Sequence, residues 1–208
     1  MNRPLKVLLA EDSQTDAELV LQELRRAGFA PEFKRVDNEA AFLQSLAAEW
    51  DIILSDYQMP QFSGLRALEL MVQSGRRRPF ILISGTIGEE LAVQAMKLGA
   101  ADYLLKDRLG RLGPAVEQAL AVQKLRKQRE RARTELRENL VFTKSVLDSL
   151  SAHIVVLDEQ GKILMTNEAW RRFARENGAA PATDQTDHFL GRSYLEACEG
   201  AGGINPRS

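Results

Sequence analysis

The sequence has almost no cysteine, no long apolar run and no internal repeat. Its single cysteine, Cys198, excludes an intrachain disulfide framework and fits a reducing compartment. No apolar run approaches the roughly 18 residues that a membrane-spanning helix needs, and an acidic pair follows the N-terminus too early for a signal peptide. We therefore expect a cytoplasmic protein without a membrane partner.

An excess of charge of one sign is lacking as well. The net charge is −1 although 27% of the residues are charged, which gives no global electrostatic argument for nucleic-acid binding. The stretch Lys124–Glu138 carries seven basic and three acidic residues, as a DNA-binding helix could. Because its acids are interleaved and no DNA-binding motif accompanies it, we expect a solvated helix face and no nucleic-acid partner.

Short apolar runs alternate with longer amphipathic stretches up to about residue 125. The runs predict strands near 5–10, 32–36, 51–55, 79–84 and 102–105. The amphipathic stretches predict helices near 14–27, 38–48, 64–74, 87–98 and from 109 onward. Strands that alternate with helices predict an α/β fold with a parallel, doubly wound sheet, and 208 residues leave room for a second domain.

Polar residues lie at or just after the carboxyl ends of four of the expected strands. Glu11 and Asp12 follow the first strand, Asp56 the third and Lys106 the fifth, and Ser84 ends the fourth. The carboxyl ends of parallel strands lie along one edge of an open α/β sheet, where ligands bind. These residues are therefore expected to form one site.

The three acids of this set predict a metal site. Two carboxylates about 4 Å apart repel each other by roughly 4 kcal/mol at an effective dielectric constant of about 20, so the cluster needs a cation. Oxygen ligands without convergent histidine or cysteine favour a hard ion, and Mg²⁺ is the expected cofactor.

Lys106 and Ser84 add what phosphoryl transfer requires. Such a reaction spreads negative charge over three equatorial oxygens, which Mg²⁺, the Lys106 ammonium and the Ser84 hydroxyl could stabilise. Asp56 ends the central strand, and its carboxylate is the expected nucleophile.

The segment from Leu5 to Val122 resembles a response-regulator receiver domain. The resemblance rests on Glu11-Asp12, on Asp56 in Leu-Ser-Asp-Tyr-Gln-Met-Pro, on Ser84 in Ile-Ser-Gly-Thr, and on Lys106 after Asp-Tyr-Leu-Leu. It implies a five-stranded flavodoxin-like sheet of strand order 2-1-3-4-5. It also implies that Asp56 accepts a phosphoryl group from a sensor histidine kinase or a histidine phosphotransfer protein.

The same resemblance implies roles for individual residues. Asp12, Asp56 and the main-chain carbonyl of Gln58 would hold Mg²⁺, with Glu11 acting through water. Ser84 and Tyr103 would form the conformational switch, and the positions of Gln58 and Thr86 would influence the lifetime of the phosphoryl group.

One position departs from the family pattern, because Asp107 follows Lys106 where receivers often carry a cis-proline. A cis bond before a residue other than proline costs about 2.5–4 kcal/mol, so this turn is either trans or strained.

A helix without glycine or proline is expected from Ala115 to about Leu150. Leucines and a threonine follow alternating four-three spacing in its second half, as in a coiled-coil seam, whereas arginines interrupt the same positions earlier. A parallel homodimer through residues 115–150 is therefore one alternative that the pattern leaves open.

The last segment resembles the start of a PAS domain. Two apolar runs, 153–158 and 163–167, flank a short turn with glycine and predict a hairpin, and an amphipathic helix follows over 168–177. A PAS sheet has five strands, and only two have matching sequence, so we expect either a part of a longer signalling protein or a poorly packed last segment. The expected domains are a receiver (1–122), a helical linker (123–150) and a partial PAS domain (151–208).

Two other functions remain open beside the phosphoacceptor. The acidic cluster could serve a Mg²⁺-dependent phosphohydrolase, although Gln58 stands where a second acid would act as proton donor. The fold could also be a docking scaffold that is never phosphorylated. Neither His153 nor His188 lies in the helical segment typical of a histidine kinase, so the only catalysis expected is the chain's own phosphoryl uptake and loss.

Overall fold

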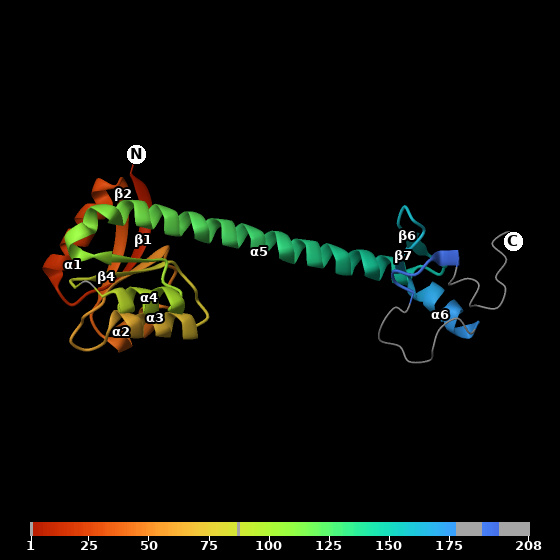
Figure 1. Ribbon diagram of the computed structural model, residues 1–208, viewed down its shortest axis with the longest axis horizontal. Helices are drawn as coiled ribbons and strands as arrows, with labels where there is room; N and C mark the ends of the chain where they lie inside the picture. The colour runs from red at the N-terminus through yellow and green to blue at the C-terminus, as the bar shows by residue number, and fades with distance from the viewer. Residues whose placement is uncertain (1, 87, 178–188, 196–208) are drawn as a thin grey trace. The chain divides into compact units, whose positions relative to one another are not determined.

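A computed structural model describes residues 2–86, 88–177 and 189–195 of the chain. The chain divides into two compact units, Met1–Arg129 and Glu130–Ser208. The first unit is built on a sheet of five parallel strands (Figure 1). The strands are β1 (Arg3–Ala10), β2 (Phe29–Val36), β3 (Ile52–Asp56), β4 (Phe80–Ser84) and β5 (Asp102–Leu105).

The strand order is β2-β1-β3-β4-β5, which confirms the predicted topology. Every residue of β3 and β4 is buried, because helices cover both faces of the sheet. The edge strand β2 begins at Phe29, three residues before the predicted start. Pro31 hid this beginning in the sequence, but proline is tolerated in an edge strand, where one side of the backbone needs no partner.

Five helices surround the sheet and enclose a core on each face. They are α1 (Gln14–Arg26), α2 (Glu39–Ser45), α3 (Gly64–Gln73), α4 (Glu89–Leu98) and α5 (Leu112–Ser149). The side chains of Ser13, Asn38 and Ser63 accept hydrogen bonds from backbone N–H groups in the first turns of α1, α2 and α3. These caps explain why the three helices begin where they do.

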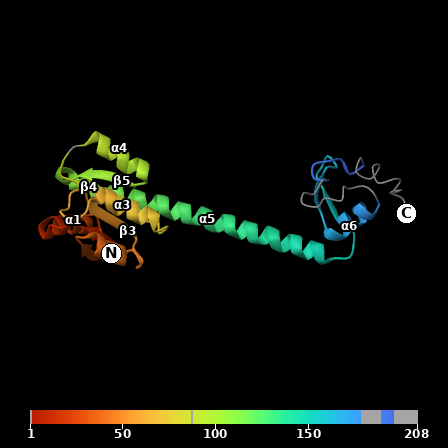
Figure 2. The same cartoon turned by 90° about the horizontal axis from the view of Figure 1, so that it is seen from below.

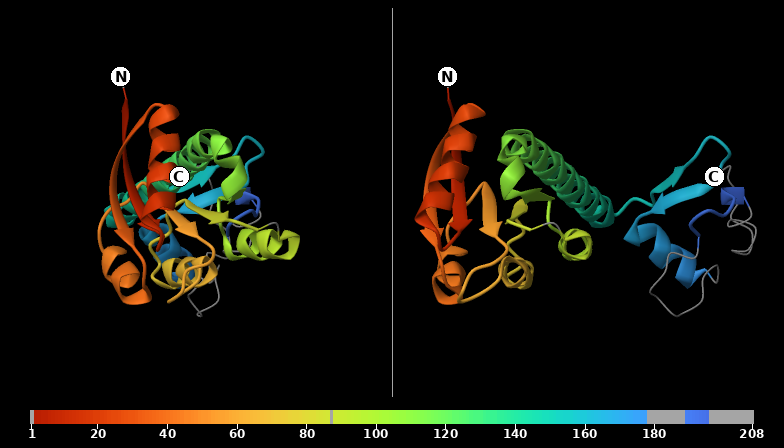
Figure 3. Two further views of the ribbon diagram at one scale, coloured as in Figure 1. Left: turned by 90° about the vertical axis from the view of Figure 1, so that its left-hand side faces the viewer. Right: turned by 60° about the vertical axis from the view of Figure 1, so that its left-hand side comes forward.

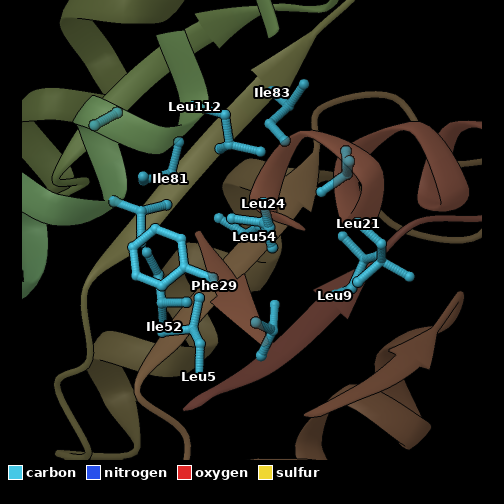
Figure 4. Packing of buried hydrophobic residues seen from close by; sticks show 14 of the residues in the cluster. Leu5, Leu9, Leu21, Leu24, Phe29, Ile52, Leu54, Ile81, Ile83 and Leu112 are labelled. Carbon is cyan, nitrogen blue, oxygen red and sulfur yellow. The ribbon is translucent and has the colours of Figure 1, made fainter. Parts of the chain in front are cut away.

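The helices α1 and α5 cover one face of the sheet, and α2, α3 and α4 lie on the side away from α5 (Figure 1). On the first face, Leu5, Leu9, Ile52, Leu54 and Ile81 of the strands pack against leucines of α1 and against Leu112 of α5 (Figure 4). The alternate residues of the same strands pack against the helices of the other face. Because successive side chains of a strand point to opposite faces, the same strands contribute to both cores.

The helix α5 continues without interruption from Leu112 to Ser149 (Figure 2). Its buried residues all lie between Leu112 and Ala119. A short 3₁₀ helix, Lys106–Arg111, connects β5 to its start.

The second unit contains a hairpin and a helix, as the sequence predicted. The antiparallel strands β6 (Val155–Leu157) and β7 (Ile163–Thr166) lie beside α6 (Glu168–Glu176) (Figure 3). A small core joins Ile163, Trp170, Ala174 and Phe189. His188 and Cys198 lie outside the described residues.

The buried side chain of Asn167 connects the hairpin, α6 and the end of α5. Its Oδ1 accepts hydrogen bonds from Ile154 N and Trp170 N. Its Nδ2 lies within hydrogen-bonding distance of three main-chain carbonyls, those of Leu147, Leu150 and Ala152. One amide thus satisfies polar groups at two helix ends, which explains why an asparagine is buried completely.

Candidate functional site

The predicted site residues meet at the carboxyl edge of the sheet. The parallel register pairs Ala10 with Ser55, Asp56 with Ile83, and Ser84 with Leu105. The strands β1, β3, β4 and β5 therefore end at nearly the same level. The residues that end or follow them, from Glu11 to Lys106, are brought to one place although they are far apart in sequence.

Three carboxylates converge at this edge. Glu11, Asp12 and Asp56 each offer an oxygen, and the three oxygens lie within 4.8 Å of one another. Glu11 and Asp56 are buried, with 2% and 5% of their surface exposed, whereas Asp12 is exposed. Burial, and then the charge of Asp56, raises the pKa of Glu11 to about 7. Burial is also the main cause that raises the pKa of Asp56, against the opposing charge of Lys106.

Lys106 is the cation of the site. Its Nζ lies 3.2 Å from Asp56 Oδ2 and 3.4 Å from Glu11 Oε2. Burial alone would lower the pKa of Lys106, but its hydrogen bonds and ion pairs with carboxylates outweigh this effect and raise the pKa above the ordinary value. The ammonium therefore stays charged at neutral pH, next to the carboxylate that ends the central strand.

Asp16, which was not among the predicted site residues, is the nearest partner of Lys106. Asp16 Oδ2 lies 2.5 Å from Lys106 Nζ, closer than Asp56 Oδ2 or Glu11 Oε2. Asp16 belongs to the first turn of α1, where its backbone N–H donates to the Ser13 hydroxyl. Its place in the first turn of the helix that directly follows the acidic pair was the available signal.

Ser84 and Tyr103 both donate a hydrogen bond to the main-chain carbonyl of Thr86. The Ser84 Oγ to Thr86 O distance is 3.1 Å, and the Tyr103 hydroxyl lies 2.8 Å from the same oxygen. The Thr86 N–H donates in turn to Ser84 Oγ. The two residues predicted as a switch are therefore connected through one peptide of the loop that follows β4.

The loop after Asp56 is fixed by backbone hydrogen bonds. Tyr57 N donates to Ile83 O, and Gln58 forms an antiparallel bridge with Ser63. The start of α3 then packs directly on the end of β3, because a Cβ at Gly64 would lie 2.4 Å from both Asp56 O and Leu82 Cδ1. Only glycine permits this approach, which holds the main chain around Asp56 and Gln58 in place.

The turn after Lys106 was predicted to be either trans or strained by a cis bond, and the structure has the trans form. The described residues include no cis peptide bond, so the bond between Lys106 and Asp107 is trans. Asp107 enters the 3₁₀ helix that follows β5. This departure from the family pattern still leaves Lys106 within 3.2 Å of Asp56.

The donor set fits a small hard cation. Two oxygens on opposite sides of a Mg²⁺ ion lie about 4.2 Å apart, so acids within 4.8 Å of one another need only a small adjustment. The carboxylates of Glu11, Asp16 and Asp56 lie within 3.4 Å of the Lys106 ammonium, and the carboxylate of Asp12 adds a further negative charge to the cluster. A divalent cation would relieve the remaining repulsion.

Comparison with protein families identifies the first unit. The family model described as "Response regulator receiver domain" matches residues 7–117, which is more than half of the chain. The match covers the second half of β1, the whole of β2 to β5 and the predicted site residues.

Curated relatives share the same part of the chain. A protein-glutamate methylesterase/protein-glutamine glutaminase of Caulobacter vibrioides is 32% identical over 113 residues, which are 53% of this chain and 33% of that protein. Response regulator protein FleR of Pseudomonas aeruginosa is 37% identical over 102 residues, 49% of this chain and 21% of FleR. The chain thus spans a third or less of the length of these two relatives.

Solved structures agree on the fold. The signal receiver domain of an HD domain-containing protein from Pseudomonas fluorescens aligns with a TM-score of 0.51 and 27% identity. The alignment covers 59% of this chain and 98% of that domain. A receiver domain protein from Clostridium thermocellum, 24% identical, gives a TM-score of 0.51 and supports the fold alone.

Among the described residues, no helix is long and apolar enough to cross a membrane.

Proposed function

Because this chain belongs to the response-regulator receiver domain family, we propose that it is the phosphoacceptor module of a two-component phosphorelay, with Asp56 as acceptor. The observation that carries this proposal is the position of Asp56. Its buried carboxylate lies 3.2 Å from the Lys106 ammonium and within an acidic cluster suited to a cation. The donor is the phospho-histidine of a sensor kinase or of a histidine phosphotransfer protein.

In the proposed reaction, an oxygen of Asp56 attacks phosphorus in line. The bond from phosphorus to oxygen forms as the bond from phosphorus to the donor histidine nitrogen breaks, and the imidazole leaves with the electron pair. Lys106 neutralises one phosphoryl oxygen, and the Ser84 hydroxyl turns from Thr86 O toward another. Mg²⁺, when bound, supplies positive charge to the remaining oxygen.

We propose that Asp12, Asp56 and the main-chain carbonyl of Gln58 hold this Mg²⁺ ion, with Glu11 acting through water. The close oxygens of the three acids support the assignment. Mg²⁺ at ten times its dissociation constant is expected to raise the free energy of unfolding by about 1.4 kcal/mol. Asp12→Asn should reduce this gain, and a thermal midpoint that does not respond to millimolar Mg²⁺ would contradict the metal site.

Ser84 and Tyr103 are proposed to transmit the phosphorylated state. Both hydroxyls now meet at Thr86 O, so a Ser84 hydroxyl that moves to the phosphoryl group leaves Tyr103 as the remaining donor to that carbonyl. The side chains of Gln58 and Thr86, each two residues beyond a site residue, are proposed to set the lifetime of the phosphoryl group.

Labelling with a small acyl phosphate tests the acceptor. The wild-type chain should gain one phosphoryl group in the presence of Mg²⁺, and Asp56→Asn should gain none. Asp107→Asn is the matched control, because it removes an exposed acid beside Lys106. Equal labelling of the wild type and Asp56→Asn would refute the assignment. Repeated turnover of a phosphate ester would instead favour the phosphohydrolase, and no labelling of any variant would favour the docking scaffold.

Beyond the receiver, we propose a helical linker (123–150) and the beginning of a PAS domain (151–208). The hairpin of β6 and β7 followed by α6 supports the PAS assignment. The buried Asn167 side chain forms hydrogen bonds both with the chain at the end of α5 and with the first turn of α6. Through these bonds, a change in the position of α5 would be passed to the hairpin and α6.

We further propose that α5 forms a parallel homodimer. Its second half exposes large apolar side chains, which a second helix could cover. They are Leu136, Leu140, Val141, Phe142 and Val146, and Leu150 follows directly after the helix. Sedimentation equilibrium should give a dimer for the wild-type chain and a monomer for the double variant Leu136→Lys, Leu140→Lys. The control Lys127→Ala should remain dimeric, and a monomeric wild type at tens of micromolar would refute the proposal.

A further inference from the structure

Arg35 holds the main chain of the acidic loop that connects β1 to α1. Its Nη1 donates to Glu11 O at 2.9 Å and to Asp12 O at 3.0 Å. The hydrogen-bond ladder of α1 begins only afterwards, where Ala17 N donates to Ser13 O. One guanidinium nitrogen therefore donates hydrogen bonds to two consecutive carbonyls that precede the helix.

The position of Arg35 follows from the sheet. The β2 strand lies next to β1 with Leu9 opposite Arg35, and Glu11 N donates to Val36 O one step further along. The side chain of Arg35 thus starts beside the last residues of β1 and has to cross only a short distance to reach the loop.

The loop carries two of the three acids of the cluster, and they are anchored differently. The Glu11 carboxylate accepts a hydrogen bond from Ser13 N at 3.1 Å and pairs with Lys106. Asp12 is exposed, so its carboxylate depends more on the main chain to which it is attached. The carbonyl of Asp12 is one of the two that Arg35 holds.

From this geometry we infer that Arg35 is a positioning residue for the acidic cluster, which acts through the peptides of Glu11 and Asp12 to place the Asp12 carboxylate for a divalent cation. This inference rests on the metal site of the proposed function. It deepens that proposal, because it assigns part of the cation affinity to a positively charged residue.

The sign of the effect separates this role from simple electrostatics. Arg35 is itself a cation near the site, and removing a positive charge should by Coulomb's law strengthen the binding of Mg²⁺. If Arg35 positions the loop, its removal should instead weaken binding. Loss of a residue that orients metal ligands typically lowers metal affinity by about 10–100-fold.

The experiment measures Mg²⁺ dissociation constants by calorimetry for the full chain and three variants. Arg35→Met removes the donors, Arg35→Lys keeps a charged donor, and Lys34→Met removes a neighbouring exposed charge from the same strand. We expect about tenfold weaker binding for Arg35→Met. Arg35→Lys should recover at least half of this loss on a logarithmic scale, and Lys34→Met should bind as tightly as the wild type or more tightly. Arg35→Met that binds Mg²⁺ as tightly as Lys34→Met would overturn the inference.

A second measurement does not need the metal. The Ser13 N–H donates to the Glu11 carboxylate within the same loop. Its hydrogen exchange in the presence of a chelator should be faster in Arg35→Met than in the wild type and Lys34→Met. Unchanged exchange in Arg35→Met would overturn the inference even if its Mg²⁺ affinity fell. A wild type that binds no Mg²⁺ would refute the proposed metal site, whereas the exchange result would still decide whether Arg35 orders the loop.

Discussion

The buried carboxyl group of Glu11 should make the stability of the first unit depend on pH. Burial and the charge of Asp56 raise the pKa of Glu11 from 4.5 to about 7 in the folded chain. The folded chain then binds this proton more tightly than the unfolded chain. The stabilisation from protonated Glu11 is complete below pH 4.5 and is lost as the pH rises through about 7. Between pH 5 and pH 8 the loss amounts to about 2–3 kcal/mol.

Urea unfolding without divalent ions can measure this loss. The chain contains two tryptophans, Trp50 in the first unit and Trp170 in the second. In a Trp170→Phe background, the fluorescence of Trp50 reports on the first unit alone. Between pH 5 and pH 8, we expect the free energy of unfolding of the Trp170→Phe protein to fall by about 2–3 kcal/mol more than that of the same protein with Glu11→Gln, whose amide cannot lose a proton.

Glu32→Gln is the control for this experiment, because it removes an exposed carboxylate of β2. It should keep the full pH dependence. Parallel pH profiles for Glu11→Gln and its parent would refute the reasoning, since they would mean that the carboxyl group of Glu11 is as easily ionised in the folded chain as in the unfolded chain.

Three further predictions concern packing and the partner of Lys106. Gly64→Ala should lower the free energy of unfolding by about 2 kcal/mol, because its Cβ would overlap Asp56 O; thermal unfolding measures this. Asn167→Ala should cost about 3 kcal/mol in urea unfolding followed by Trp170 fluorescence, because it leaves buried polar groups without partners. Asp16→Asn should slow labelling by a small acyl phosphate about fivefold, since an ion pair of about 1 kcal/mol no longer holds Lys106. Glu18→Gln, which removes a charge from the same helix, should label at the rate of the wild type, and a rate for Asp16→Asn at or above that of the wild type would contradict this role.

Much of the first unit was predictable because its signals are local. Alternating apolar runs and amphipathic stretches depend only on neighbouring residues, and they gave the α/β class and the approximate strands. The strand order came from the family resemblance, and the structure confirms it. The beginning of β2 was not predictable from local rules, because Pro31 disfavours a strand unless the strand lies at an edge.

The candidate site, too, was predictable in part from the sequence and in part only from the structure. The sequence by itself determined that Glu11, Asp12, Asp56, Ser84 and Lys106 stand at strand ends, and therefore that they share one edge of a parallel sheet. Only the tertiary structure decided which groups they touch. The nearest partner of Lys106 is Asp16, 90 positions away, and the carbonyls of Glu11 and Asp12 are held by Arg35 from the neighbouring strand. Strand ends follow from local periodicity, whereas the reach of a long side chain depends on which elements the folded sheet places beside each other.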